Sequence, residues 1–379
     1  MNNKTFLRFA LLFMIFFLIV TASSLKDDKI NNELSKLTLN EKIGQLFVIH
    51  PEAIDPDLSL VEVNSATVGL KELTHKMKSY YKRYPAGGFI LFDKNLSGQD
   101  QLIKFNNDLH ALGKIRPFIY VDEEGGKVAR IANNKHFDVP RFDPMYLIAQ
   151  KKDEKLAYEV GNTIGKYLSE LGFDVNFAPD ADVFYENGNS VIGYRAFSSN
   201  PEVAGNMAVQ VLKGLEANNI KGCFKHFPGH GACTKDTHFD FGVVYKTWEE
   251  ILNTDIIPFN KGIENNVPFI MVSHVNYPYV TNDELPASLS YTLLTEKLRN
   301  ELNYQGLIIT DGMSMGAIHK NYDDETAAVM AIKAGVDIIL VPFAYEDAFN
   351  SLVRAVKKGE ISEQRINESV YRILSLKLN

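Results

Sequence analysis

The sequence GLIITD, residues 306–311, is a short apolar run that ends in a carboxylate, and it decides the fold together with seven similar runs. The eight runs are nearly continuously apolar instead of alternating, which is typical of parallel strands covered on both faces. They lie at residues 44–50, 87–92, 117–122, 174–178, 221–226, 268–274, 306–311 and 336–341. Stretches of helical period lie between or after them, as at 156–171, 201–218 and 362–376. Eight strand-then-helix units predict an α/β protein, a single-domain (β/α)8 barrel of the TIM type.

The same alternation of strands and helices could also form a doubly wound open sheet. No GxGxxG dinucleotide fingerprint and no GxxxxGK phosphate loop follows any of the eight runs, which removes the usual reasons for a nucleotide-binding open sheet. No Pro/Ser-rich linker, internal repeat or block of charge divides the chain. The pattern therefore favours a single barrel that spans residues 25–379.

The composition excludes several classes of protein. The 379 residues are 45% hydrophobic and 23% charged, as in an ordinary globular protein. Forty Lys and Arg against 47 Asp and Glu give a net charge of −7, which argues against a nucleic-acid partner. The two cysteines, Cys223 and Cys233, are too few for a disulfide-dense scaffold or a cysteine-rich zinc site, and their pairing is left open.

The N-terminus has the pattern of a targeting segment. Lys4 and Arg8 precede an apolar run over residues 9–20, and four small residues follow at 21–24. A basic region, a short apolar region and a small-residue exit predict a secretory signal. The run is shorter than the roughly 20 residues of a spanning helix, so an uncleaved membrane anchor is the weaker alternative for residues 1–24. We expect an exported protein, periplasmic or extracellular, that touches a membrane only through this segment.

Ionisable side chains end several of the apolar runs. In a barrel the active site is built at the C-terminal ends of the strands, so these residues are the candidates for chemistry. Each is individually explained by the need for polar groups at strand ends, but the convergence of five such ends points to a site. The residues are Asp122, Asp180 with Asp182, Lys225 with His226, His274, and Asp311.

The segment KHFPGHGACTKDTHFD, residues 225–240, carries the densest group of such side chains. One hypothesis is a metal site made by His226, His230 and His238, but their spacing matches no strong zinc signature. The other is metal-free acid/base chemistry, in which Asp236 orients His238 so that its imidazole exchanges protons near neutral pH. We favour the second over the metal site, and a merely polar, tight loop is the remaining alternative.

The segment ITDGMSMGA, residues 309–317, contains a literal GxSxG around Ser314. This is the nucleophile elbow of α/β-hydrolases, whose triad follows the order Ser, acid, His. The only downstream histidine is His319, with no acid between it and the serine, so that triad cannot be assembled. Asp311 at the strand end is the better nucleophile, because a carboxylate needs no deprotonating partner.

Four motifs in this order resemble glycoside hydrolase family 3, and more narrowly its single-domain bacterial β-N-acetylglucosaminidases. They are VDEEGGKVAR at 121–130, IGYRAF at 192–197, KHFPGHG with DTH at 225–238, and TDGMSM at 310–315. The resemblance implies a retaining mechanism without metal or cofactor, in which Asp311 is the nucleophile and His238, paired with Asp236, is the acid/base.

The same resemblance implies a sugar-binding set that holds the hydroxyls and the N-acetyl group of the terminal sugar. The set is Asp122, Arg130, Arg195, Lys225 and His226. The sequence departs from the family at two positions: Tyr194 stands where Asp is more frequent, and Gly312 stands where a second Asp commonly follows the nucleophile. Neither change removes a primary catalytic group, but both bear on substrate detail.

The expected activity is therefore exo-acting removal of terminal β-linked N-acetylglucosamine from peptidoglycan fragments or chitooligosaccharides. The same residues would also serve a β-glucosidase or an N-acetylglucosaminide phosphorylase. A catalytically inactive carbohydrate-binding barrel is the alternative from another class, and the presence of Asp236, His238 and Asp311 argues against it.

Overall fold

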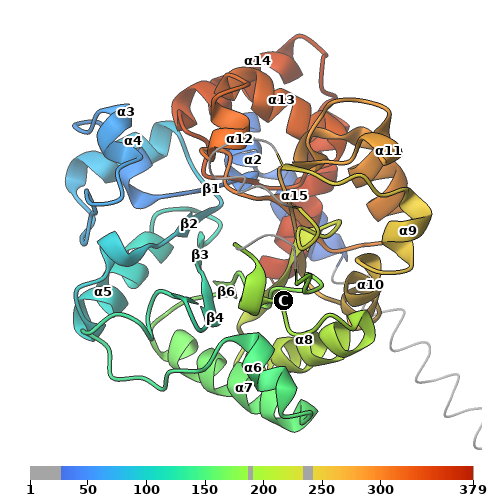
Figure 1. The fold of residues 1–379 in the computed structure, drawn as a ribbon. Helices are drawn as coiled ribbons and strands as arrows, with labels where there is room; N and C mark the ends of the chain where they lie inside the picture. The colour runs from blue at the N-terminus through green and yellow to red at the C-terminus, as the bar shows by residue number, and fades with distance from the viewer. Residues whose placement is uncertain (1–26, 187–190, 234–241, 379) are drawn as a thin grey trace, which may run out of the picture.

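The computed structural model describes residues 27–186, 191–233 and 242–378, which form a ring of parallel strands surrounded by helices (Figure 1). Neighbouring strands of the ring follow one another in chain order, and every pair is parallel. The eight strands are β1 (Phe47–Ile49), β2 (Gly88–Ile90), β3 (Phe118–Val121), β6 (Val175–Asn176), β7 (Lys221–Phe227), β9 (Phe269–Val272), β11 (Leu307–Thr310) and β12 (Ile339–Leu340).

The two ends of this sheet meet. β12 pairs with β1 through Phe47 and Ile339. On its other side, the residue just before β12 bridges β11, through Ile309 and Ile338. The predicted (β/α)8 barrel is confirmed, and each of the eight predicted apolar runs coincides with one strand of the ring, although β7 extends one residue beyond its run.

One predicted strand begins too early. The run 44–50 was expected to be extended throughout, but Gly44 and Gln45 belong to helix α2 (Leu39–Gln45). A capping box between Thr38 and Glu41 starts this helix, and its last turn extends into the apolar run. Local capping therefore shortens the strand, which starts at Phe47.

Long helices surround the ring, and three of them confirm the predicted helical stretches. These are α7 (Glu154–Glu170), α8 (Pro201–Glu216) and α15 (Glu363–Lys377). Their N-caps Asp153, Asn200 and Ser362 each accept a hydrogen bond from a first-turn backbone N–H. The other long ones are α4 (His75–Arg83), α5 (Gln99–His110), α10 (Ile256–Glu264), the π-helical η5 (Thr292–Glu301), α13 (Asp324–Ala334) and α14 (Tyr345–Lys357).

Shorter elements connect these units. They are α3 (Leu60–Val63), α6 (Met145–Gln150), α9 (Trp248–Leu252), α11 (Pro278–Thr281), α12 (Gly316–His319), η1 (Pro51–Ile54), η2 (Asp93–Asn95), η3 (Gly193–Arg195), η4 (Ala287–Leu289), and the two-stranded pairs β4 (Glu123–Gly125) with β5 (Val128–Ala129) and β8 (Gly242–Val243) with β10 (Val275–Asn276).

Helices α7 and α8 pack with their backbones in close approach. A Cβ atom at Gly161 would lie 2.2 Å from the carbonyl oxygen of Val211, and one at Gly214 would lie 2.3 Å from that of Tyr158. Only glycine fits at such positions. The close packing fixes α7 and α8, which flank β6 in the chain, against each other.

The inside of the ring is filled by large side chains. The buried Tyr120 ring lies 5.2 Å from Phe177 and 6.0 Å from Phe269, measured between centroids. As in other barrels of this type, the interior is a packed core, so the site must be built at one end of it. Among the described residues, no helix is long and apolar enough to cross a membrane, and the predicted signal segment 1–24 lies outside those residues.

Candidate active site

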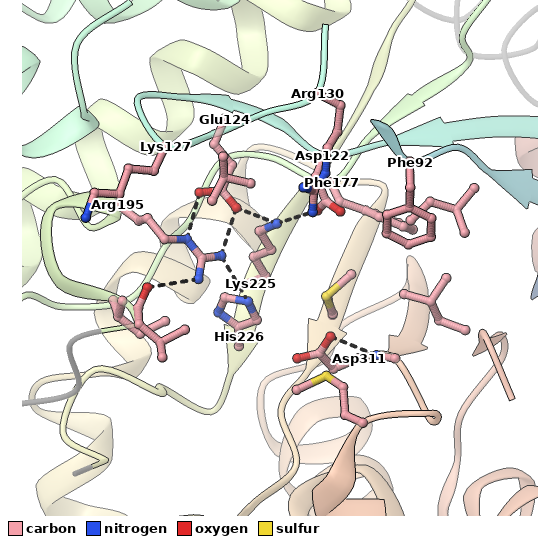
Figure 2. A pocket seen from close by; sticks show the side chains of 18 of the residues that line it. Phe92, Asp122, Glu124, Lys127, Arg130, Phe177, Arg195, Lys225, His226 and Asp311 are labelled. Carbon is pink, nitrogen blue, oxygen red and sulfur yellow. Dashed lines mark hydrogen bonds and ion pairs between the residues drawn. The ribbon is translucent and has the colours of Figure 1, made fainter. Parts of the chain in front are cut away.

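A pocket of about 790 Å³ opens at the C-terminal ends of the strands. Its polar residues come from distant parts of the chain: from the turns after β3 and β11, from β7, and from η3 (Figure 2). The structure brings together every described member of the predicted site. The pocket is lined by Asp122, Arg130, Arg195, Lys225, His226 and Asp311.

The centre of this arrangement is Glu124, which the sequence analysis quoted within a motif but did not single out. Nε and NH2 of Arg195 donate to its two carboxylate oxygens at 2.9 and 2.8 Å. Nζ of Lys225 lies 2.6 Å from Oε1 of the same group. Figure 2 shows Glu124 between these two cations. One buried carboxylate therefore fixes two of the predicted sugar-binding side chains.

Glu123, its neighbour in sequence, points elsewhere. Its carboxylate accepts hydrogen bonds from the backbone N–H groups of Ile131 and Ala132 and from the hydroxyl of Tyr167, at 2.7 to 2.9 Å. Successive residues of a strand face opposite sides, so one glutamate of the pair reaches the pocket and the other holds the following loop. The alternation in β4 indicates that only one of the two glutamates reaches the pocket, and the sequence does not say which one.

The charges of this network are mutually stabilised. Burial by itself raises the pKa of Glu124, but the charges of Arg195 and Lys225 outweigh it and lower that pKa to about 2. Burial likewise lowers the pKa of Lys225, and the carboxylates of Asp122 and Glu124 raise it above its ordinary value. The network therefore stays ionised at neutral pH.

Two further predicted residues lie beside this network. Asp122 accepts a hydrogen bond from Nζ of Lys225 at 2.9 Å. Arg130 donates to Asp93 at 3.1 Å, and its guanidinium lies 5.6 Å from the centroid of the Phe92 ring. Within the described residues, Nε of Arg130 is buried without a hydrogen-bond partner. Charged groups fixed in this way give strong, oriented hydrogen bonds to a polar ligand.

His226 is oriented from behind by a buried aspartate. Its Nδ1 donates to Oδ2 of Asp182 at 2.8 Å, and the backbone N–H of His230 donates to Oδ1 at 2.6 Å. This places Nε2 of His226 on the side of Arg195, 3.4 Å from NH2. Burial and the neighbouring His226 lower the pKa of His230 to about 4, so His230 is neutral at physiological pH.

Asp180, Asp182 and His226 are also the described residues that could hold a cation, since their ligand atoms lie within 4.8 Å of one another. This set shares only His226 with the histidine triad considered from the sequence. Nε of Arg195 already lies 3.4 Å from Oδ2 of Asp180, and His226 already bonds Asp182. Burial and the charge of Asp182 raise the pKa of Asp180 to about 7.

Asp311 follows β11 directly and faces the pocket. Its backbone N–H donates to Val272 on β9 at 2.9 Å, and its Oδ1 accepts from the N–H of Gly312 at 2.7 Å. His274, another strand-end candidate, supports this turn, because its Nε2 donates to the carbonyl oxygen of Gly312 at 3.0 Å. Hydrogen bonds from the ends of β9 and β11 thus hold the turn that carries Asp311, the nucleophile expected from the sequence.

The serine motif does not form a triad in the structure. Ser314 lines the pocket, but the ring of His319 stacks on Phe343, with centroids 3.7 Å apart. The predicted acid/base pair, Asp236 and His238, lies outside the described residues. Cys223 and Cys233 are both buried, and no disulfide joins them.

The chain is similar to known proteins of one enzyme family. Residues 38–376 match the family model described as the glycosyl hydrolase family 3 N terminal domain. A protein of Pseudoalteromonas piscicida named beta-hexosaminidase A is 32% identical over 80% of this chain and 55% of its own length. A beta-hexosaminidase of Hydrogenovibrio crunogenus is 34% identical over 74% of this chain and 78% of its own.

The structure also resembles a solved one. The glycoside hydrolase family 3 beta-N-acetylglucosaminidase from Paenibacillus sp. str. FPU-7 superposes with a TM-score of 0.81 at 32% identity. The match covers 90% of this chain and 62% of the Paenibacillus chain. The chain thus spans little more than half of the Pseudoalteromonas protein and less than two thirds of the Paenibacillus one.

Proposed function

Because the chain belongs to glycosyl hydrolase family 3, we propose that it is an exo-acting β-N-acetylglucosaminidase that retains the anomeric configuration. The observation that carries the proposal is the charged network of Asp122, Glu124, Arg195 and Lys225, which shares one pocket with the carboxylate of Asp311. A polyhydroxylated ring held by these groups would present its anomeric carbon to Asp311.

The reaction takes two displacements. A carboxylate oxygen of Asp311 bonds to the anomeric carbon while the glycosidic C–O bond breaks, and the leaving oxygen takes a proton from His238. Water then gives a proton to His238 and attacks the same carbon, and the bond to Asp311 breaks. Two inversions leave the sugar in its original β configuration.

A histidine acid suits this site electrostatically. A second carboxylate beside Asp311 would have to be kept protonated by burial or by like-charge repulsion, whereas the unperturbed pKa of an imidazole already lies near neutral pH. Asp236, two residues from His238, would keep the ring in the tautomer that donates toward the substrate.

The fixed charges account for recognition of a terminal sugar. Lys225 and Arg195 donate, Asp122 accepts, and the Nε2 side of His226 faces the same space. Such groups are already immobilised by one another, so binding a sugar costs little additional ordering. Natural substrates would be peptidoglycan fragments or chitooligosaccharides, met outside the cytoplasm if residues 1–24 act as an export signal.

The proposal is tested by replacing Asp311 with Ala and Ser314 with Ala in parallel, since both residues line the pocket. On an aryl β-N-acetylglucosaminide, Asp311→Ala should lower kcat by roughly 10³-fold or more, whereas Ser314→Ala should change it by less than about tenfold. Near-normal turnover by Asp311→Ala would remove Asp311 from the nucleophile role. Product analysis on chitobiose, with and without added phosphate, separates hydrolysis from phosphorolysis.

A further inference from the structure

Tyr194 is set apart from the other exposed aromatic side chains by its position. The residue is 54% exposed, and among the large hydrophobic residues that are exposed in the described part of the chain it alone lines the pocket. It directly precedes Arg195, whose guanidinium is bonded to Glu124 inside the pocket. Tyr194 therefore stands at the rim, one residue away from the sugar-binding network.

The ring of Tyr194 is held in place from one side. It stacks on Tyr146 of α6, with centroids 4.8 Å apart and planes 8° apart. Phe184 packs against both rings, 4.8 Å from Tyr146 and 6.0 Å from Tyr194. One face of the Tyr194 ring is thus covered, and the other face and the ring edge are the parts exposed to solvent.

The backbone also fixes the position of Tyr194. Gly193 has a φ of 43°, a left-handed conformation that glycine adopts readily, and it turns the chain at the start of η3. NH1 of Arg195 donates to the carbonyl oxygen of Val191 at 3.3 Å, which ties the turn to the same guanidinium. Tyr194 and Arg195 are consequently placed as one unit.

From this arrangement we infer that Tyr194, backed by Tyr146, is the binding platform for the second sugar ring of the substrate, the ring on the leaving-group side of the scissile bond. The inference rests on the proposed hydrolase function. The apolar C–H face of a pyranose packs on the negative face of an aromatic ring, and a tyrosine held by stacking offers that face with little entropy left to lose.

The geometry favours a sugar ring over other occupants. An exo-acting site holds the terminal sugar in its charged interior, so the remainder of the glycan leaves across the rim. The pocket volume of about 790 Å³ lies in the upper part of the ~300–1,000 Å³ range of small-molecule sites. Apolar residues line the pocket as well as Tyr194, among them Pro144, Met145, Val191 and Ile192.

Kinetics on two substrates test this inference. Chitobiose has a second sugar ring, whereas methyl β-N-acetylglucosaminide has only a methyl group in its place. Tyr194→Ala should lower the ratio of the two kcat/KM values, chitobiose over methyl glycoside, by roughly 3- to 10-fold, mainly through the KM for chitobiose. Tyr194→Phe, which keeps the ring, should restore the ratio.

Tyr291→Ala is the matched control, because Tyr291 is also 54% exposed and does not line the pocket. It should leave the ratio unchanged. If Tyr194→Ala lowers kcat/KM equally for both substrates, Tyr194 does not bind the second ring and the inference is wrong.

If the wild-type protein cleaves neither substrate, the proposed function fails, and the inference is then tested by measuring sugar binding with calorimetry. The wild type should then bind chitobiose more tightly than N-acetylglucosamine, and Tyr194→Ala should remove the difference. Equal affinities for the two sugars in the wild type would overturn the inference by itself.

Discussion

Arg195 donates hydrogen bonds to both carboxylate oxygens of Glu124, from Nε at 2.9 Å and from NH2 at 2.8 Å. Both side chains are buried or nearly so. Lys225 joins the same carboxylate at 2.6 Å. Glu124 contributes no group to the proposed bond-making steps. Its effect is to hold two cations at fixed positions in the pocket in which the proposed substrate would bind.

Replacing Glu124 with Gln should therefore weaken both substrate binding and the fold. The neutral amide leaves two buried cations with only part of their counter-charge, although Asp122 still pairs with Lys225 and Asp180 with Arg195. We expect KM to rise about tenfold or more. The free energy of unfolding should fall by about 3 kcal/mol, which is the lower end of the cost of breaking a buried ion pair, because part of the counter-charge remains. Steady-state kinetics and urea unfolding measure the two effects.

Glu123→Gln is the matched control for that variant. Glu123 is an adjacent, equally buried acid, but its partners are Ile131, Ala132 and Tyr167, away from the pocket. It should lose a comparable free energy of unfolding while KM stays within about twofold of the wild type. A rise in KM as large as that of Glu124→Gln would show that the effect is general destabilisation.

Replacement of His238 should affect substrates according to their leaving groups. Only a poor leaving group needs protonation as the glycosidic bond breaks, so His238→Ala should lower kcat/KM roughly 10²- to 10⁴-fold for chitobiose and much less for an activated aryl glycoside. A series of aryl glycosides with leaving groups of graded acidity measures the dependence. Equal slowing across the series would remove His238 from the acid role.

The stability of the protein should depend on pH through Asp180. Burial and the charge of Asp182 raise its pKa from 3.8 to about 7, so the folded state holds a proton that the unfolded chain releases near pH 4. This contribution to stability is fully present below about pH 4 and is lost as the pH rises through 7. Asp180→Asn, which stays neutral, should gain stability relative to the wild type by at least about 1 kcal/mol between pH 5 and pH 8. Urea unfolding of both proteins at these two pH values would refute the assignment if their difference stayed constant.

Asp337 should matter for the fold and not for catalysis. It lies two residues before β12, and its carboxylate pairs with Arg299 and Arg372 and accepts hydrogen bonds from Ser369 at 2.6 Å and from the N–H of Ile308 at 3.0 Å. This is the N-terminal end of the barrel, opposite the pocket. Asp337→Asn should lower the free energy of unfolding by about 3 kcal/mol and leave kcat and KM unchanged well below the melting temperature. A variant with normal stability and impaired kcat would contradict this view.

The sequence by itself determined the barrel and most of the polar residues of its pocket. Continuous apolar runs such as GLIITD have no stable position except between two covering layers, and eight of them alternating with helices close into one ring. Because all C-terminal strand ends meet on one face, the position of Asp122, Lys225 and Asp311 in one pocket follows from their place at the ends of those runs.

Tertiary structure alone decided three other features. It selected Glu124 over Glu123 as the partner of Arg195, since adjacent glutamates are equivalent until the pleat of β4 sends them to opposite sides. It turned His274 into support for the Asp311 turn, and it stacked Tyr194 on Tyr146, which is 48 positions earlier in the chain. Each depends on contacts between distant segments, and the strand-end pattern that brings Asp122, Lys225 and Asp311 to one face does not say which individual side chains will pair there. Barrel closure brings them together.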